Sequence, residues 1–237
     1  MMMRFLPLFA LALSASAAFG QGRKVAFRTL CLDQVEGVTE LVLPAAKAGE
    51  AGTTVPLYTS APSEVFEATF QTNDVVFHTK GTPADKPLVA ARGTLAKSSR
   101  QIFILMPGPT GEGKPPYVMR AYDDDEATFK LGSIRAINLS PVPVRFIMAG
   151  ATTPQIPPDK YAIISQATKV DEYNMYQAGV EFLSGNGSWV NGYSASWKAS
   201  NRRREIVITM VDGKFKQPVV KLFSDMPQWL EKPPGTP

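Results

Sequence analysis

An internal repeat constrains the fold of this chain more than any other feature of its sequence. Four apolar segments of the first half are matched, in the same order, by four segments of the second half. The matched pairs are 28–32 with 135–139, 40–44 with 144–148, 99–106 with 203–210, and 118–124 with 219–225. The offset is 107 positions for the first pair and 101 for the last. Because order and spacing are both kept, we interpret the chain as a tandem duplication of one structural unit.

The repeat places the boundary between the two units after residue 128. Residues 21–128 form the expected first unit and residues 129–226 the second, each about the size of an ordinary small domain. Turn signals such as Asp212-Gly213 separate short apolar runs within each unit. The strand-like runs are 25–32, 40–43, 54–58, 65–70, 74–78, 88–95, 101–106 and 117–122 in the first unit, and 132–139, 144–148, 160–167, 173–183, 192–199, 205–211 and 219–223 in the second.

These runs predict an all-β fold. Seven or eight short strands per unit are typical of an immunoglobulin-like β-sandwich. The 20 prolines among 237 residues agree with strands joined by turns. Residues 63–72 fit either a strand or one short helix, and the almost wholly apolar run 101–106 predicts a central strand.

The two ends of the chain differ in character from the units. Arg4 followed by an apolar run at 5–18 and small residues is typical of a secretory signal peptide, which we assign to residues 1–20. The apolar run is too short for a membrane-spanning helix. The pattern predicts export to the periplasm, the cell surface or the medium. Residues 227–237 are rich in proline and are expected to form an extended tail outside the second unit.

The number of cysteines and the net charge say little about what the protein binds. Cys31 is the only cysteine, which excludes an internal disulfide. We expect it to be a small buried hydrophobic residue, the alternative being an exposed thiol that links two chains. The formal net charge of +4 makes contact with anionic surfaces plausible without specifying one.

The sequence offers little for catalysis or metal binding. His78 is the only histidine, and no Gly-x-Ser-x-Gly elbow accompanies it, so a serine hydrolase triad is not expected. A zinc site normally needs several His or Cys ligands. The acidic run 123–126 lacks calcium-loop spacing, and we interpret it as a solvated linker between the units. The alternative is that it holds the units apart or accepts basic residues. We therefore predict no catalytic residue, no cofactor and no metal site.

Three aromatic residues of the second unit form a candidate ligand platform. Trp189, Tyr193 and Trp197 are four positions apart, which places them on one face of a regular strand. An exposed row of this kind would suit stacking against sugar rings. The alternative is that the three rings fill the core, and the Asn191-Gly192 pair would break the row if it turned the chain.

The arginine run of the second unit is the other candidate. Arg202, Arg203 and Arg204 precede a strong strand, and clustered arginines can grip phosphate or sulfate. The matching turn of the first unit, 97–100, is also basic, so we expect both units to present basic tips. The alternative is a solubilising hairpin. We do not expect an exported protein to bind nucleic acid. We therefore expect the arginine run to bind an anionic polymer of the cell envelope.

One segment carries a family resemblance. Residues 135–141, Arg-Ala-Ile-Asn-Leu-Ser-Pro, resemble the opening strand of uncharacterised bacterial exported β-sandwich domains, which begin with Arg-x-x-Asn-x-Ser-Pro. Residues 156–161 fit the proline-containing turn and strand that follow in those domains. The first unit has Leu32-Asp33-Gln34 where that motif would place Leu-Ser-Pro. The resemblance implies an envelope or extracellular setting and brings no catalytic residues.

Together these patterns predict a non-enzymatic exported protein that binds an envelope protein or an anionic or polysaccharide polymer, or serves as a scaffold. This expectation rests on what β-sandwiches commonly do and not on a site. The alternative is a carbohydrate-binding or carbohydrate-active protein that uses the aromatic residues of the second unit. A hydrolase centred on Asp or Glu is the third hypothesis.

Overall fold

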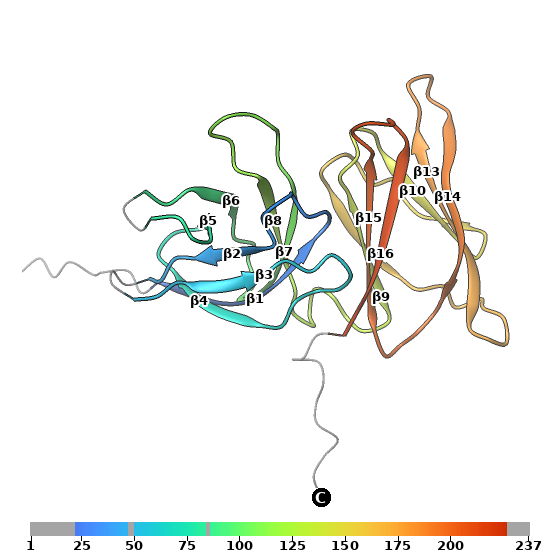
Figure 1. Ribbon diagram of the computed structural model, residues 1–237. Helices are drawn as coiled ribbons and strands as arrows, with labels where there is room; N and C mark the ends of the chain where they lie inside the picture. Colours follow the sequence, from blue (N-terminus) through green and yellow to red (C-terminus); the bar gives the residue numbers. More distant parts are fainter. Residues whose placement is uncertain (1–21, 47–49, 84–85, 227–237) are drawn as a thin grey trace, which may run out of the picture.

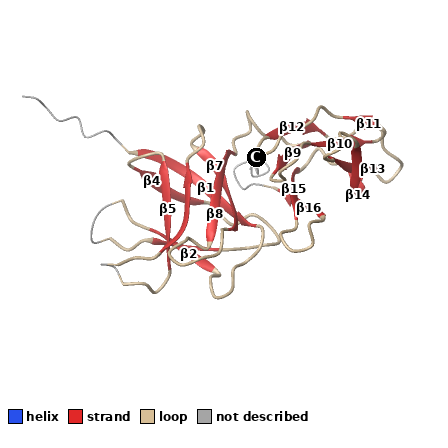
Figure 2. Cartoon of the chain, turned by 90° about the horizontal axis from the view of Figure 1, so that it is seen from above, coloured by secondary structure: helices blue, strands red, loops and turns tan. Residues whose placement is uncertain are grey.

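The computed structural model describes residues 22–46, 50–83 and 86–226, and within these ranges every regular element is a β-strand (Figure 2). The all-β prediction is therefore confirmed, and residues 63–72 contain a strand, not a helix. The described residues hold no helix able to cross a bilayer. The expected signal peptide at 1–20 and the tail at 227–237 lie outside the described residues.

The sixteen strands of the described residues fall into two sets that share no backbone ladder. The first unit contains β1 (Arg23–Cys31), β2 (Glu40–Leu43), β3 (Thr53–Pro56), β4 (Phe66–Phe70), β5 (Asp74–Thr79), β6 (Val89–Thr94), β7 (Arg100–Pro107) and β8 (Tyr117–Asp123). The second contains β9 (Ser133–Asn138), β10 (Val144–Met148), β11 (Ala151–Thr152), β12 (Tyr161–Ser165), β13 (Met175–Leu183), β14 (Trp189–Lys198), β15 (Arg204–Val211) and β16 (Pro218–Asp225). The boundary expected after residue 128 falls between β8 and β9.

The first unit is one continuous sheet that folds over its own core. Its strand order is β3-β2-β5-β6-β8-β7-β1-β4, and the two halves are joined by a short parallel pairing of β6 with β8. Residues from both halves fill the core, where the rings of Phe27 and Phe103 stack with centroids 4.6 Å apart. The unit thus has the layers of a sandwich, but its two layers belong to one hydrogen-bonded sheet. Strand β7 lies between β8 and β1, as the apolar run 101–106 predicts.

The second unit is a sandwich of two separate sheets. The inner sheet has the order β12-β9-β15-β16 and faces the first unit, whereas the outer sheet has the order β11-β10-β13-β14 and lies on the far side (Figure 1). Phe146, Val180 and Trp197 of the outer sheet pack against Ile134 and Val207 of the inner one.

Residues aligned by the repeat occupy equivalent places in the two units. Arg28 of β1 pairs in parallel with Ile102 of β7, and Arg135 of β9 pairs in parallel with Ile206 of β15. The strand orders β4-β1-β7-β8 and β12-β9-β15-β16 also correspond. This agreement is what a duplicated unit requires, and the duplication itself stays a prediction.

These corresponding sheets pack against each other and join the two units. The contact is an apolar group that we call the junction cluster. Its buried members are Leu30, Leu32, Ile102, Ile104, Tyr122, Phe129, Ile137, Ile206, Ile208 and Phe223, with Met106, Leu139 and Met210 partly buried beside them. Every member except Phe129 has its repeat counterpart in the same cluster. The junction is therefore close to self-complementary, like the interface of a two-fold dimer.

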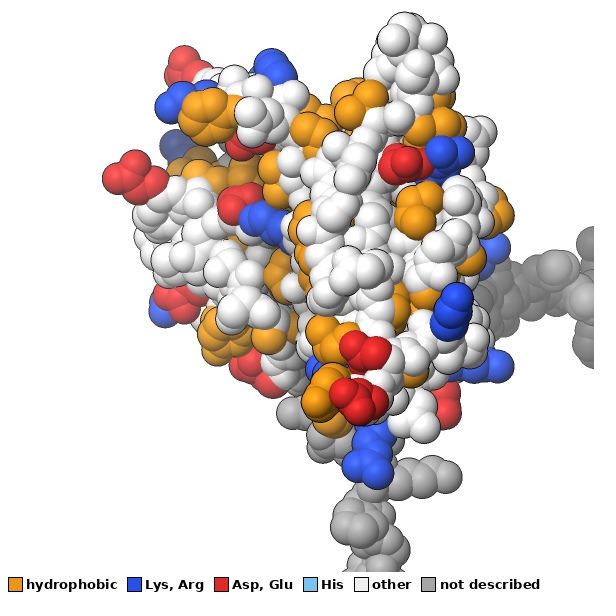
Figure 3. Space-filling view, turned by 90° about the vertical axis from the view of Figure 1, so that its right-hand side faces the viewer, with side chains coloured by type: hydrophobic (Ala, Val, Ile, Leu, Met, Phe, Trp, Pro, Cys, Tyr) orange, Lys and Arg blue, Asp and Glu red, His pale blue; other side chains and the backbone are white. Residues whose placement is uncertain are grey.

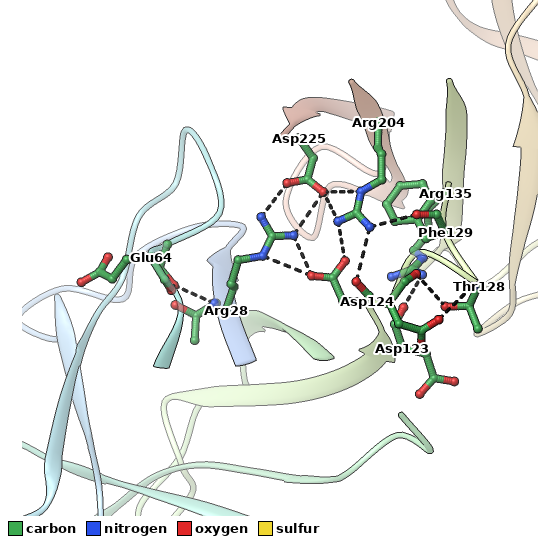
Figure 4. Close-up of polar contacts among 12 residues, drawn as sticks. Arg28, Glu64, Asp123, Asp124, Thr128, Phe129, Arg135, Arg204 and Asp225 are labelled. Atoms are coloured by element: carbon green, nitrogen blue, oxygen red, sulfur yellow. Dashed lines mark hydrogen bonds and ion pairs between the residues drawn. The ribbon is translucent and has the colours of Figure 1, made fainter. Parts of the chain in front are cut away.

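A closed ring of four charges borders the junction cluster, and we call it the junction ring (Figure 4). The guanidinium of Arg28 donates to Asp225 at 2.6 Å and to Asp124 at 2.7 Å. Arg204 donates from Nη2 to Asp124 at 2.6 Å and from Nε to Asp225 at 2.9 Å. All four residues are buried. Each carboxylate thus bridges one arginine of the first unit and one of the second.

The free-energy cost of burying these charges determines how the ring affects stability. Burial alone would raise the pKa of Asp225, but hydrogen bonds and charges from Arg28 and Arg204 outweigh it and lower that pKa below its ordinary value. Removing one partner from a buried charge pair leaves the other charge uncompensated, which typically costs about 3–5 kcal/mol. An exposed pair contributes about 0–1 kcal/mol.

We predict that Asp225→Asn lowers the free energy of unfolding by about 3–5 kcal/mol, because it leaves Arg28 and Arg204 sharing a single carboxylate. The matched control is Asp33→Asn, which removes the exposed inter-unit bridge from Lys221 at 2.8 Å and should cost at most about 1 kcal/mol. Urea denaturation followed by circular dichroism measures both. Equal losses in the two variants would contradict the role given to the ring.

Candidate functional site

The arginine run is divided between two places. Arg204 opens β15 with its side chain on the junction face, where it is fully buried in the junction ring. The expectation that Arg204 belongs to an exposed ligand-binding tip is therefore wrong. Arg202 and Arg203 remain in the turn before β15 and line a cavity at the end of the second unit. The run contributes two arginines to a surface, not three.

That cavity has a volume of about 730 Å³ and lies where five chain segments of the sandwich end. We call it the end cavity. Its lining residues are Gly132, Gln166, Ala167, Thr168, Val170, Asn174, Lys198, Ala199, Ser200, Asn201, Arg202 and Arg203. Basic and amide side chains dominate its polar lining.

The aromatic row does not form, because a β-bulge interrupts β14. Tyr193 is opposite Val180 and Asn191 is opposite Glu181, so Gly192 is an extra residue and the side-chain alternation reverses there. Trp197 is only 5% exposed, and Tyr193 packs beside it in the core. The expected exposed platform is therefore wrong for these two residues.

Trp189 lies on the opposite, outer face of β14. The guanidinium of Arg145 covers its ring at 4.4 Å and is held by Glu181 at 2.5 Å. Figure 3 looks onto this side of the molecule, where hydrophobic side chains are scattered among polar ones and do not gather into one flat patch. A single half-buried tryptophan is what remains of the three-ring platform.

The acidic run 123–126 is not a solvated linker. Asp124 is fully buried in the junction ring, and Asp123 accepts a hydrogen bond from the backbone N–H of Ser98 at 2.6 Å. Asp125 accepts a hydrogen bond from the N–H of Thr128 and so closes the turn that leads into the second unit. The run therefore links the two units through hydrogen bonds and ion pairs.

Cys31 and His78, the only cysteine and the only histidine of the sequence, both lie on strands of the first unit. Cys31 is buried, as expected, and burial raises the pKa of its thiol to about 11. His78 is half-buried on β5, where burial and the charge of Arg92 lower its pKa.

The Arg-x-x-Asn-x-Ser-Pro segment has a structural role at the end of β9. The amide of Asn138 donates to the carbonyls of Val142 and Ile156, and its oxygen accepts a hydrogen bond from Ser140. These bonds pin the chain where it passes from the inner sheet to the outer one.

Arg135, the repeat counterpart of Arg28, is buried without a carboxylate. Its guanidinium packs over the rings of Phe129 at 4.3 Å and Tyr161 at 5.7 Å. One nitrogen donates to the carbonyl of Asp123, while Nε and Nη1 have no hydrogen-bond partner among the described residues. Burial lowers its pKa to about 10. This charge was not anticipated from the sequence.

Beside Arg135 lies a groove of about 550 Å³ between the two units, lined in part by Tyr122 and Tyr161. Arg120 of the first unit and Asp159 of the second form an ion pair at 2.7 Å beside it. Strand β12 borders the groove and is an edge strand, because within the part of the chain that the structure describes it pairs only with β9. Tyr161 is 46% exposed and Ile163 is 41% exposed on its junction-facing side. We call this surface the β12 edge.

We predict that Trp197→Ala destabilises the protein by about 3–5 kcal/mol, because it leaves a large cavity in the core of the second unit. Trp189→Ala should cost clearly less, since that ring is half-buried on the outer face. Urea unfolding of both variants makes the comparison. Similar losses would contradict the reversal of side-chain direction at Gly192.

Comparisons with known proteins leave the family open. No protein-family model and no curated protein matches the chain. Among solved structures, a candidate cell adhesion protein from Bacteroides uniformis is similar over 85% of this chain and 98% of its own, with 10% sequence identity and a TM-score of 0.22.

Proposed function

We propose that this protein is a non-enzymatic, exported binding or scaffold protein that takes an extended segment of a partner protein at the β12 edge. The observation that carries the proposal is the unpaired edge of β12, with exposed Tyr161 and Ile163, beside the groove between the units. Export rests on the pattern of residues 1–20.

The β12 edge lacks the usual protection of an exposed strand. Proteins commonly guard such edges with charged side chains, proline or bulges, because an unpaired edge can join another strand. Strand β12 reads Tyr-Ala-Ile-Ile-Ser and contains neither charge nor proline. Its counterpart at the edge of the first unit, β4, carries Glu67 in an exposed ion pair with Lys24. Edge strand β3 ends in Pro56. Only β12 of these three is open to strand addition.

The groove beside this edge suits an added strand. An extended segment that pairs with β12 would gain main-chain hydrogen bonds, and its side chains would meet the rings of Tyr122 and Tyr161. Because the junction cluster and junction ring hold the two walls together, the groove is in place before the partner arrives. Such preorganisation reduces the entropy lost on binding.

The direct test is affinity capture from an envelope extract of the source organism, with residues 21–237 as bait. We predict that the wild-type chain enriches a protein partner and that Ile163→Lys loses it, because a lysine side chain would occupy the apolar docking face. The matched control is Leu222→Lys, at a residue that is also 41% exposed but lies on the opposite edge of the same sheet.

Capture should survive in the control variant. Retention of the partner by Ile163→Lys would contradict the proposal, as would enrichment of a polysaccharide with no protein. Circular dichroism of both variants establishes that each keeps the fold of the wild-type protein.

A further inference from the structure

We propose that the end cavity of the second unit binds an oxyanion group, a sulfate, phosphate or carboxylate, carried by an anionic polymer. This site is separate from the β12 edge and does not depend on the function proposed for that edge.

The topology brings donors from distant segments to one place. The chain after β12 contributes Gln166, the end of β14 contributes Lys198, and the turn before β15 contributes Arg202 and Arg203. Loops at the end of a sandwich are held by rigid sheets, which is a common arrangement for binding sites. A volume of about 730 Å³ lies within the range of ligand cavities and exceeds the needs of a single small ion.

The charge of the lining favours an anion. It includes three cationic side chains and no carboxylate. Glu205 holds the Nε of Arg203 at 2.7 Å, which orients the guanidinium and offsets one of the three charges. Nearby Asp171 is engaged with the backbone N–H groups of Tyr173 and Met175. Positive charge therefore remains in excess.

Gln166 provides a second, independent observation. Its side-chain oxygen accepts a hydrogen bond from the backbone N–H of Ser200, and this fixes which end of the amide faces the backbone. The Nε2 group is buried and has no hydrogen-bond partner among the described residues. A buried donor normally finds an acceptor. Gln166 lines the cavity, so an oxyanion there would supply one once the amide turned toward it.

The corresponding turn of the first unit is closed by its own side chain. Gln101, which aligns with Glu205, accepts a hydrogen bond from the backbone N–H of Ala96 and donates to the carbonyls of Ala96 and Ser98. The turn is basic, with Lys97 and Arg100, and the Gln101 amide is fully engaged by backbone groups of the turn. It therefore serves as a basic control at the matching position of the first unit.

Isothermal titration with dextran sulfate tests the proposal, with uncharged dextran as the reference polymer. The wild-type protein should bind dextran sulfate and not dextran. Lys198→Gln combined with Arg202→Gln should weaken binding by about tenfold or more, because two charge-assisted contacts are lost. Gln166→Glu should do the same, since it keeps the acceptor for Ser200 but replaces the buried donor with a carboxylate.

Lys97→Gln combined with Arg100→Gln removes the same charge from the first unit and should leave the affinity within about twofold. If inorganic sulfate competes with dextran sulfate, the cavity binds the free sulfate group. If inorganic sulfate does not compete but the cavity variants still lose binding, the cavity binds the group only as part of the polymer. Equal weakening in the two charge variants, unchanged binding by Gln166→Glu, or no binding by the wild type would overturn the proposal. Ile163→Lys should bind dextran sulfate normally, which separates this site from the β12 edge.

Discussion

Two arginines and two aspartates, withdrawn from water between two β-structured units, set the geometry on which the rest of this molecule depends. A buried ion ring adds little net stability compared with apolar residues of the same shape, because desolvation offsets much of the attraction. We infer that its effect is on specificity, because any other docking of the units would leave buried charges unpaired. Arg28 and Arg204 each contact both Asp124 and Asp225, so the four charges are matched only in this arrangement.

The apolar part of the junction explains why the central strands look as they do. In β7, Phe103 and Leu105 face the core of the first unit, whereas Ile102 and Ile104 face the second unit. A strand buried on both faces reads as a continuous apolar run and not as an alternation. The same faces of the two units meet, and this makes the contact nearly self-complementary. The same junction places Tyr122 of the first unit and Tyr161 of the second at the groove beside β12.

Strand positions could be read from the sequence because they depend on local patterns, but the sites could not. The expected run 101–106 lies within β7, each of the other expected runs overlaps an observed strand, and the two-residue strand β11 was not expected. By contrast, the bulge at Gly192 reverses side-chain direction without changing the composition of β14, so Tyr193 and Trp197 face the core while Trp189 lies on the outer face. Asp124 looked solvated because its partner Arg204 is 80 positions away. The open edge of β12 depends on the strand order, which local patterns do not determine.

The central claim is that the two units form one rigid body, and a distance measurement between them tests it most directly. Spin labels on cysteines introduced at Glu67 of β4 and Ser196 of β14, both exposed, would report that distance by pulsed electron resonance, while buried Cys31 stays unlabelled. The account predicts a single narrow distance distribution for the wild-type background. A broad or multiple distribution would contradict it, because it would show that the junction cluster and junction ring do not fix the relative orientation of the units.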